Sequence, residues 1–546
     1  DNYLTYNVKY YKGLGTSTGS EFKEYFQNKK IVYFNHNGDD CDNAVDMVFN
    51  KKRSDDRKDW LGNYDRKAYL DTNCDSVTYR EFINKEMIHF SKYDCERSIP
   101  NLMDGLKISL RKILFSAFKK NLTQEIKVAQ FSGYVSEHSG YHHGEASLNA
   151  AIVGLAQNYV GSNNINLFMP NGQFGTRLQG GKDSASERYI FTQLNKITRH
   201  IFPSADDAIL EYLDDDGLSV EPRFYAPIIP MILVNGSKGI GTGFSTDILP
   251  HNPLDIIKYI KLKLENKPYH NVIDFQPYFN GFTGGIMKVS SNKYLLTGKY
   301  SIIGKNKIRV TELPVGFWTD DFKQHLENLA SNVDKNGKKI QPIVKDIDDM
   351  SKTTNVDFVV TFHGDRLQIL ESNTCDNGCN GLEKTLKLYS TVTTSNMHMF
   401  DANDKLKKYE NIEHIIDDYF DVRLEMYQTR KSHMIKVRTY ECSILENKAR
   451  YITEILNETI DLRKKKKDVI IQLLKSKNYT VFDNDEEYKY LLKMSMDSVS
   501  EENVEKLTKE FNEKMEELNL IKSTSIEHMW LHELQTLKQM YVKSQK

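Results

Sequence analysis

The densest group of residues able to move protons or bind metal in the 546-residue chain lies between Glu137 and Glu145. It holds three histidines and two carboxylates within nine residues. The His-Glu-x-x-His order of a zinc site is absent and no cysteine is near, so we predict no metal ligands here. A histidine that faces a polyanion can instead transfer a proton or contact a phosphate.

A basic segment precedes this group. Between Arg97 and Lys120, six lysines and arginines stand against the single carboxylate of Asp104, a local charge of +5 in a chain whose net charge is -1. Any attraction to a nucleic acid must therefore come from a local patch, and this segment suits a phosphate backbone. Taken alone, it could also be a solvated helix face.

A glycine-rich segment, Asn235 to Gly243, lacks the spacing of both a phosphate loop and a dinucleotide-binding loop. It predicts a tight turn that brings the backbone close to another group. Ile240 is its one bulky apolar residue, and such a side chain on a rigid loop can wedge between base steps.

A tyrosine follows an arginine directly in the polar turn that holds Arg188 and Tyr189, just before the apolar Ile190. A tyrosine can act as a nucleophile. Because the chain has 31 tyrosines, the residues alone leave open whether this one reacts or packs.

The elements that must position these residues fall into two kinds. All twelve prolines lie between Pro100 and Pro342, so long helices are allowed after them. The apolar spacing predicts one charged helix over about 408 to 458 and another over 504 to 521, opened by a capping box at Ser498 to Glu501. The two helices favour an antiparallel coiled coil, although an ordinary helical bundle fits the same spacing.

The middle of the chain has shorter elements. Residues 97 to 252 predict a loop-rich α/β domain, and residues 254 to about 400 predict a separate α/β insert with strands such as Lys307 to Leu313 and Val356 to Phe362. Six scattered cysteines are typical of a reducing compartment. No run of about 18 apolar residues, signal peptide or start methionine is visible, so we expect a soluble piece of a longer polypeptide that does not enter a membrane.

Taken together, these segments resemble the DNA breakage-reunion core of the eukaryotic-type IIA DNA topoisomerases. Six motifs occur in the order of that family and at about its spacing. They are Lys9 to Thr18 (KYYKGLGTST), Asp55 to Leu61 (DDRKDWL), Arg97 to Pro100 (RSIP), Tyr141 to Glu145 (YHHGE), Gly172 to Arg177 (GQFGTR) and Arg188 to Thr192 (RYIFT).

The resemblance implies an α+β multidomain fold. Its parts are a Toprim tail over 1–53, connecting helices over 54–96, a winged-helix DNA-binding domain over 97–252, an α/β tower over 254–402, and a long antiparallel coiled coil with a C-terminal dimer gate over 403–546.

It also implies that Tyr189 attacks a DNA phosphate and leaves a 5'-phosphotyrosyl link. Arg188, Arg97 and His143 match residues that stabilise the reacting phosphate. A phenol of pKa ~10 is mostly protonated at neutral pH, so it needs a base or cationic surroundings.

Four further residues match DNA contacts of the family: Lys12, Lys107, Arg111 and Ile240. Double-stranded DNA and a second copy of the chain are the implied partners, and the nucleus is the implied location. Mg²⁺ and ATP are the cofactors of the family, but its metal-binding Glu and Asp-x-Asp-x-Asp segments and its ATPase domain are not found in this sequence. We therefore expect weak cleavage, or none, from these residues alone.

The sequence departs from the family at two places. Ile108-Ser109-Leu110 replaces the usual Pro-Gly-Gln, and Glu187 places a carboxylate beside Arg188. Two other interpretations stay open: a non-catalytic dimeric DNA clamp in which Tyr189 merely packs, and a nuclease that uses metal-activated water. The nuclease is disfavoured because no carboxylate cluster has metal spacing.

Overall fold

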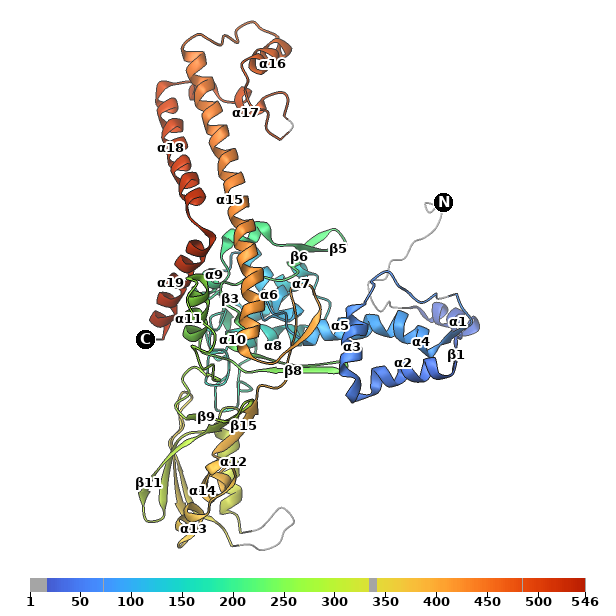
Figure 1. Cartoon of the computed structure of the whole chain (residues 1–546), viewed down its shortest axis with the longest axis vertical. Helices are drawn as coiled ribbons and strands as arrows, with labels where there is room; N and C mark the ends of the chain where they lie inside the picture. The colour runs from blue at the N-terminus through green and yellow to red at the C-terminus, as the bar shows by residue number, and fades with distance from the viewer. Residues whose placement is uncertain (1–16, 72, 333–340, 484, 546) are drawn as a thin grey trace. The chain divides into compact units, whose positions relative to one another are not determined.

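The computed structural model describes residues 17–71, 73–332, 341–483 and 485–545, and its fold is mixed α/β (Figure 1). Two compact units can be separated. The first comprises the described residues up to Cys95 together with Gly241–Phe244, and the second comprises Glu96–Ile240 and Ser245 to the end of the described chain.

The first unit is mainly helical. Its strands β1 (Tyr33–Asn35) and β2 (Ser76–Thr78) form a parallel pair. Thr78 begins the next helix with a capping box in which Glu81 returns a side-chain bond to its backbone. The helices are α1 (Gly19–Gln27), α2 (Asp39–Phe49), α3 (Ser54–Gly62) and α4 (Tyr79–Phe82), which continues through the π-helix Ile83–Met87 into α5 (Ile88–Ser98).

The centre of the second unit is a helical core with short strand pairs. Helices α6, α7 and α8 pack against one another around side chains such as Ile113, Phe131 and Ile152, which have no exposed surface. The helices are α6 (Ile108–Lys119), α7 (Val128–Ser139), α8 (Glu145–Ala156), α9 (Thr198–Ile201), η4 (Ser204–Ile209), α10 (Met231–Asn235) and α11 (Pro253–Leu264). The paired strands are β3 (Ile126–Lys127) with β4 (Phe191–Thr192), β5 (Tyr212–Asp215) with β6 (Leu218–Pro222), and β7 (Ser237–Gly241) with β8 (Phe244–Ile248).

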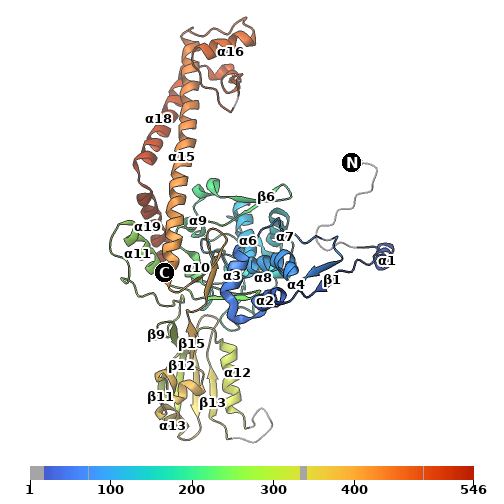
Figure 2. The ribbon, with the colours of Figure 1, turned by 45° about the vertical axis from the view of Figure 1, so that its right-hand side comes forward.

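Residues 285–393 form two antiparallel sheets. One has the order β15-β10-β9 and the other β11-β12-β14-β13. In β12 every second residue is buried, so Ile308 and Val310 enter the core while Arg309 stays outside. Helix α12 (Thr319–Ala330) lies alongside β13 (Figure 2). The strands are β9 (Gly285–Ser290), β10 (Lys293–Thr297), β11 (Lys299–Gly304), β12 (Lys307–Glu312), β13 (Val344–Asp349), β14 (Phe358–Phe362) and β15 (Tyr389–Thr393), and the short helices are α13 (Arg366–Ser372) and α14 (Gly381–Thr385).

The C-terminal part follows the hairpin β16 (Met397–Phe400) with β17 (Leu406–Tyr409). Helix α15 (Ile412–Leu456) confirms the long helix predicted over about 408 to 458. Small helices α16 (Lys467–Ser476) and α17 (Lys489–Leu492) lead to α18 (Glu501–Ser523) and α19 (Ile526–Ser544).

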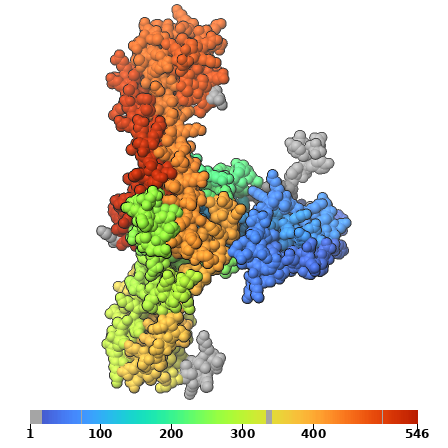
Figure 3. Space-filling view, viewed as in Figure 1, coloured from blue at the N-terminus to red at the C-terminus, as the bar shows by residue number. Residues whose placement is uncertain are grey.

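Helices α15 and α18 run in opposite directions (Figure 1), and Figure 3 shows their orange and red segments side by side. Arg438 pairs with Glu517 at 2.9 Å, while Glu441, further along α15, pairs with the earlier Lys514 at 3.5 Å. The predicted cap of α18 is displaced by two residues, because Ser500 and not Ser498 accepts the bond that begins the helix.

Candidate functional site

The loop that carries Tyr189 is fixed by its own polar bonds. Asp183 accepts hydrogen bonds from the backbone N–H of Thr176 at 2.8 Å and from its Oγ1 at 2.6 Å. Gly175 has a φ of +95°, and a Cβ there would lie 2.5 Å from the Cα of Gly181. Only glycine allows this approach, so the two arms of the loop are held together.

Tyr189 itself projects from this frame. Its backbone N–H donates to Ser186 at 2.9 Å, and the carbonyl of the buried Ile190 accepts from Val128, the first residue of α7, at 3.0 Å. The Tyr189 side chain nevertheless keeps 76% of its surface exposed, and Arg188 is exposed as well. The phenol and the guanidinium therefore face outward from a backbone that is anchored on both sides.

A second part of the site lies where α5 ends and α8 begins. Arg97 is the penultimate residue of α5, and His143 precedes α8. The pKa of His143 is lowered, first by partial burial and then by the positive charges of Arg97, His142 and Lys112. These residues are thus near neighbours, and the imidazole of His143 is neutral at pH 7.

Lys112 is a residue that the motifs did not single out. Its Nζ donates to Glu221 at 2.7 Å and to the carbonyl of Ser139, so its charge is held near His143. In the sequence, only the place of Lys112 in the basic segment indicates a role at this site. No sequence pattern indicates that Glu221 is its partner.

Lys107 lies half-buried just before α6. Its Nζ donates to the carbonyl of Lys238 in β7 at 2.7 Å, and burial lowers its pKa. It therefore links α6 to the glycine-rich hairpin and keeps donors for a further acceptor.

Arg111, a predicted DNA contact, is buried. It is 6% exposed, and its Nε and Nη2 bind the two oxygens of the buried Asp104 at 2.7 and 3.2 Å. This pairing argues against the predicted contact of Arg111 with DNA, because its guanidinium is already committed inside the protein.

The glycine-rich segment is the hairpin of β7 and β8, and it confirms the expected close approach. A Cβ on Gly239 would lie 1.9 Å from the carbonyl oxygen of Ser98. The side chain of Ile240 is 84% exposed, which leaves it free to insert into a ligand. Lys12, the remaining predicted DNA contact, lies outside the described residues.

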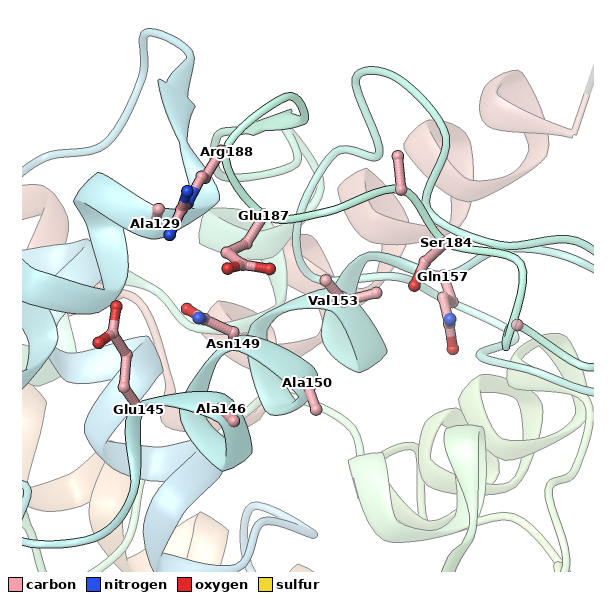
Figure 4. Close-up of a pocket in the computed structure, with 12 residues that line it drawn as sticks. Ala129, Glu145, Ala146, Asn149, Ala150, Val153, Gln157, Ser184, Glu187 and Arg188 are labelled. Atoms are coloured by element: carbon pink, nitrogen blue, oxygen red, sulfur yellow. The ribbon is translucent and has the colours of Figure 1, made fainter.

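A pocket of about 500 Å³ borders Arg188. Figure 4 shows Glu187 extending toward Asn149 of α8, while Arg188 extends toward Ala129. Asn149 is buried, and its Oδ1 accepts no hydrogen bond from the part of the chain that the structure describes. Glu187, the carboxylate that departs from the family pattern, thus lines the pocket and points away from Arg188.

Neither a metal centre nor a membrane span is found in residues 17–71, 73–332, 341–483 and 485–545. No group of three or more His, Cys, Asp or Glu side chains in these ranges could hold a metal ion. In the same ranges, no helix is both long and apolar enough to cross a bilayer.

Comparison with known families gives two matches. The family of the A subunits of DNA gyrase and topoisomerase IV matches residues 97–535, and a C-terminal associated domain of TOPRIM matches residues 1–95.

Individual relatives agree. DNA topoisomerase 2 of Arabidopsis thaliana is 41% identical over 98% of this chain and 38% of its own length. The mitochondrial DNA topoisomerase 2 of Dictyostelium discoideum is 39% identical over 100% of this chain and 42% of its own. A crystal structure of the Plasmodium falciparum topoisomerase II DNA-binding, cleavage and re-ligation domain superimposes with a TM-score of 0.83 at 40% identity, covering 100% of this chain and 76% of that one. The chain therefore spans about two-fifths of the length of the curated relatives.

Proposed function

The chain belongs to the DNA gyrase/topoisomerase IV family of type II DNA topoisomerases, and from this premise we propose that it is the core that cuts and reseals duplex DNA. The observation that carries the proposal is the exposed Tyr189 beside Arg188 on a loop anchored at both ends. The comparisons give no support to the non-catalytic clamp.

In the proposed reaction the phenol oxygen of Tyr189 attacks a DNA phosphorus. The phenol gives up its proton, the bond from phosphorus to the 3'-oxygen breaks, and that oxygen leaves as a 3'-hydroxyl after it takes up a proton. The product is a 5'-phosphotyrosyl link. Because this link conserves the phosphodiester energy, the 3'-hydroxyl reverses the step without a nucleotide.

Three side chains support this step. Arg188 and Arg97 offset the negative charge that builds up on the phosphoryl oxygens. His143, whose pKa is held below its ordinary value, is a neutral imidazole that can accept a proton or a hydrogen bond at pH 7.

DNA would lie along the β7–β8 hairpin and the start of α6. Lys107 supplies a cation for a backbone phosphate, and the exposed Ile240 wedges between base steps and bends the duplex. Arg111 supports this surface from inside, through Asp104, without touching DNA.

The domain assignments follow the same premise. Residues 97–252 act as the winged-helix domain, 254–402 as the tower, and 403–546 as the coiled coil with a dimer gate. The working unit is a homodimer in the nucleus, although one relative is a mitochondrial enzyme. In the family, Mg²⁺ supports cleavage and ATP drives duplex passage.

The test uses a polypeptide that contains this chain and is extended to the full length of its relatives. It is incubated with supercoiled plasmid and Mg²⁺, and the reaction is stopped with detergent. We expect protein covalently attached to 5' ends in the wild type, none in Tyr189→Phe, and normal attachment in Tyr33→Phe, a control tyrosine that is 65% exposed. No attachment in any variant, with DNA binding intact, would leave the clamp as the better account.

A further inference from the structure

A second pocket, of about 390 Å³, lies in the second unit away from Tyr189. It is formed by the end of α6, by α9 and η4, and by the β5–β6 hairpin, which lies next to α6 (Figure 1). None of the residues assigned above to cleavage or DNA contact lines it.

The floor of this pocket is aromatic. Phe115 and Tyr225 are 8% and 3% exposed, and Phe118 meets Tyr225 edge to face with ring centres 5.4 Å apart. Tyr212 closes one side, 6.2 Å from Phe115. A rigid aromatic floor of this kind accepts a flat apolar ring.

The polar groups gather nearer the mouth. Lys119, Tyr212 and Ser219 are exposed, while Arg199 and Asp207 are half-buried. Tyr212 and Tyr225 both line the pocket, so their hydroxyls can contact a ligand there.

Two cations already cover the aromatic faces. The guanidinium of Arg199 lies 3.5 Å from the ring centre of Phe118 and binds Asp207 at 3.1 Å. The Nζ of Lys119 lies 5.5 Å from the ring centre of Phe115. An incoming cation would meet occupied faces and like charge.

The charges around the pocket favour an anionic ligand. Lys119 and Arg199 outnumber the one carboxylate, Asp207, and the Nε and Nη2 of Arg199 have no partner among the residues that the structure describes. These nitrogens, with Lys119, can form charge-assisted bonds to an anion.

We propose that this pocket binds a planar aromatic molecule that carries an anionic group. The ring packs against Tyr212 and Tyr225, beside the two cations, and the anion is held by Lys119 and Arg199. The site is independent of DNA cleavage, so its test does not depend on the function proposed above.

The probes are three naphthalenes that differ only in charge: 2-naphthoate, neutral 2-naphthamide and cationic 2-naphthylmethylamine. Each is titrated into this chain, and binding is followed by saturation-transfer NMR and calorimetry. We expect saturable binding of 2-naphthoate, about tenfold tighter than that of the amide, because a bond to a charged group contributes more than a neutral one. The amine should bind most weakly.

Two exposed variants locate the site without disturbing the core. Ser219→Trp fills the mouth and should abolish binding of 2-naphthoate, whereas Lys119→Gln should weaken it about threefold to tenfold. The matched control is Lys120→Gln, the next residue, whose Nζ lies over Tyr134 instead. Thermal midpoints equal to that of the wild type show that each variant is folded.

Three results would overturn the proposal: no saturable binding of any probe, tighter binding of the amine than of the naphthoate, or binding that Ser219→Trp leaves unchanged. The first would reject the pocket, the second its charge preference, and the third its location.

Discussion

Arginines occupy two opposite settings in the second unit. Arg188 stands exposed in the loop of Tyr189 and extends toward Ala129, while the neighbouring Glu187 extends toward Asn149 (Figure 4). Arg111 is buried and pairs through two bonds with Asp104, and Arg177 pairs with the buried Glu312. A charge count along the sequence does not separate these settings, but the presence of a buried carboxylate does.

Two arginines in the first half of α15 are almost completely buried. Arg423 and Arg430 are 0% and 1% exposed, and both reach the carboxylate of Asp206. Both guanidiniums also lie over the ring of Tyr427, at 4.1 and 4.3 Å. An arginine cannot lose its proton, so its burial requires such partners. These buried arginines secure the fold, whereas the exposed Arg188 is left for a ligand.

The largest expected effect comes from breaking a buried pair. Arg111→Met leaves Asp104, which has no exposed surface, without its cation. Removing one partner of a buried pair costs about 3–5 kcal/mol of unfolding free energy. The urea midpoint of the second unit, followed by tryptophan fluorescence and circular dichroism, should fall accordingly.

Arg188→Met is the matched control for Arg111→Met, because it removes the same group from an exposed position. Its urea midpoint should stay near that of the wild type. If Arg111→Met instead keeps its midpoint but loses DNA affinity with a shallower salt dependence, Arg111 contacts phosphate after all.

The next effect is on the reaction. Arg188→Met should lower the rate of covalent attachment to DNA about 10²- to 10³-fold, because it removes a charge that stabilises the transition state. The rate is measured in the extended protein under single-turnover conditions. Arg188→Lys should recover part of the loss, since a charge remains without the planar fork of N–H donors. Equal rates in all three proteins would show that Arg188 takes no part.

The sequence was a good guide to elements with strong periodicity. The long helix α15 and the strands at Lys307–Glu312 and Phe358–Phe362 were predicted within a few residues, because apolar spacing and the absence of proline determine them locally. The close approach at Gly239 was also expected from its glycines. The burial of Arg111 was not, because its partner Asp104 was counted only as one negative charge in a basic segment. The support of Lys112 by Glu221, 109 positions away in the sequence, depends on tertiary packing that no local pattern reveals.

A buried histidine tests the same contrast between buried and exposed charged groups, without an ion pair to a carboxylate. His251 is 1% exposed, and burial lowers its pKa to about 4. Above pH 6.5 it is neutral in both the folded and the unfolded state. Below that pH the unfolded state binds a proton that the folded state refuses, so the unfolding free energy falls, by about 2 kcal/mol at pH 5.

The measurement is the urea midpoint at pH 7 and pH 5. Wild type should lose more stability between these values than His251→Gln does. His270→Gln, which changes a histidine with a 57% exposed side chain, should behave like the wild type. Identical pH dependence in all three proteins would mean that His251 is already protonated inside the fold.

The smallest effect on stability should come from Ile240→Ala. Since this side chain is 84% exposed, its loss should change the unfolding free energy by less than about 0.5 kcal/mol. Its effect should appear in DNA instead, where a missing wedge lowers the bend of a duplex labelled at both ends with fluorescent dyes and weakens binding by about 1 kcal/mol. Ile303→Ala, at a residue that is 52% exposed in β11, serves as the control and should change neither quantity. If the bend is the same in all three proteins, then Ile240 is exposed for another reason. In that case an exposed apolar side chain does not by itself identify a DNA wedge, whereas a buried carboxylate partner does identify a structural arginine.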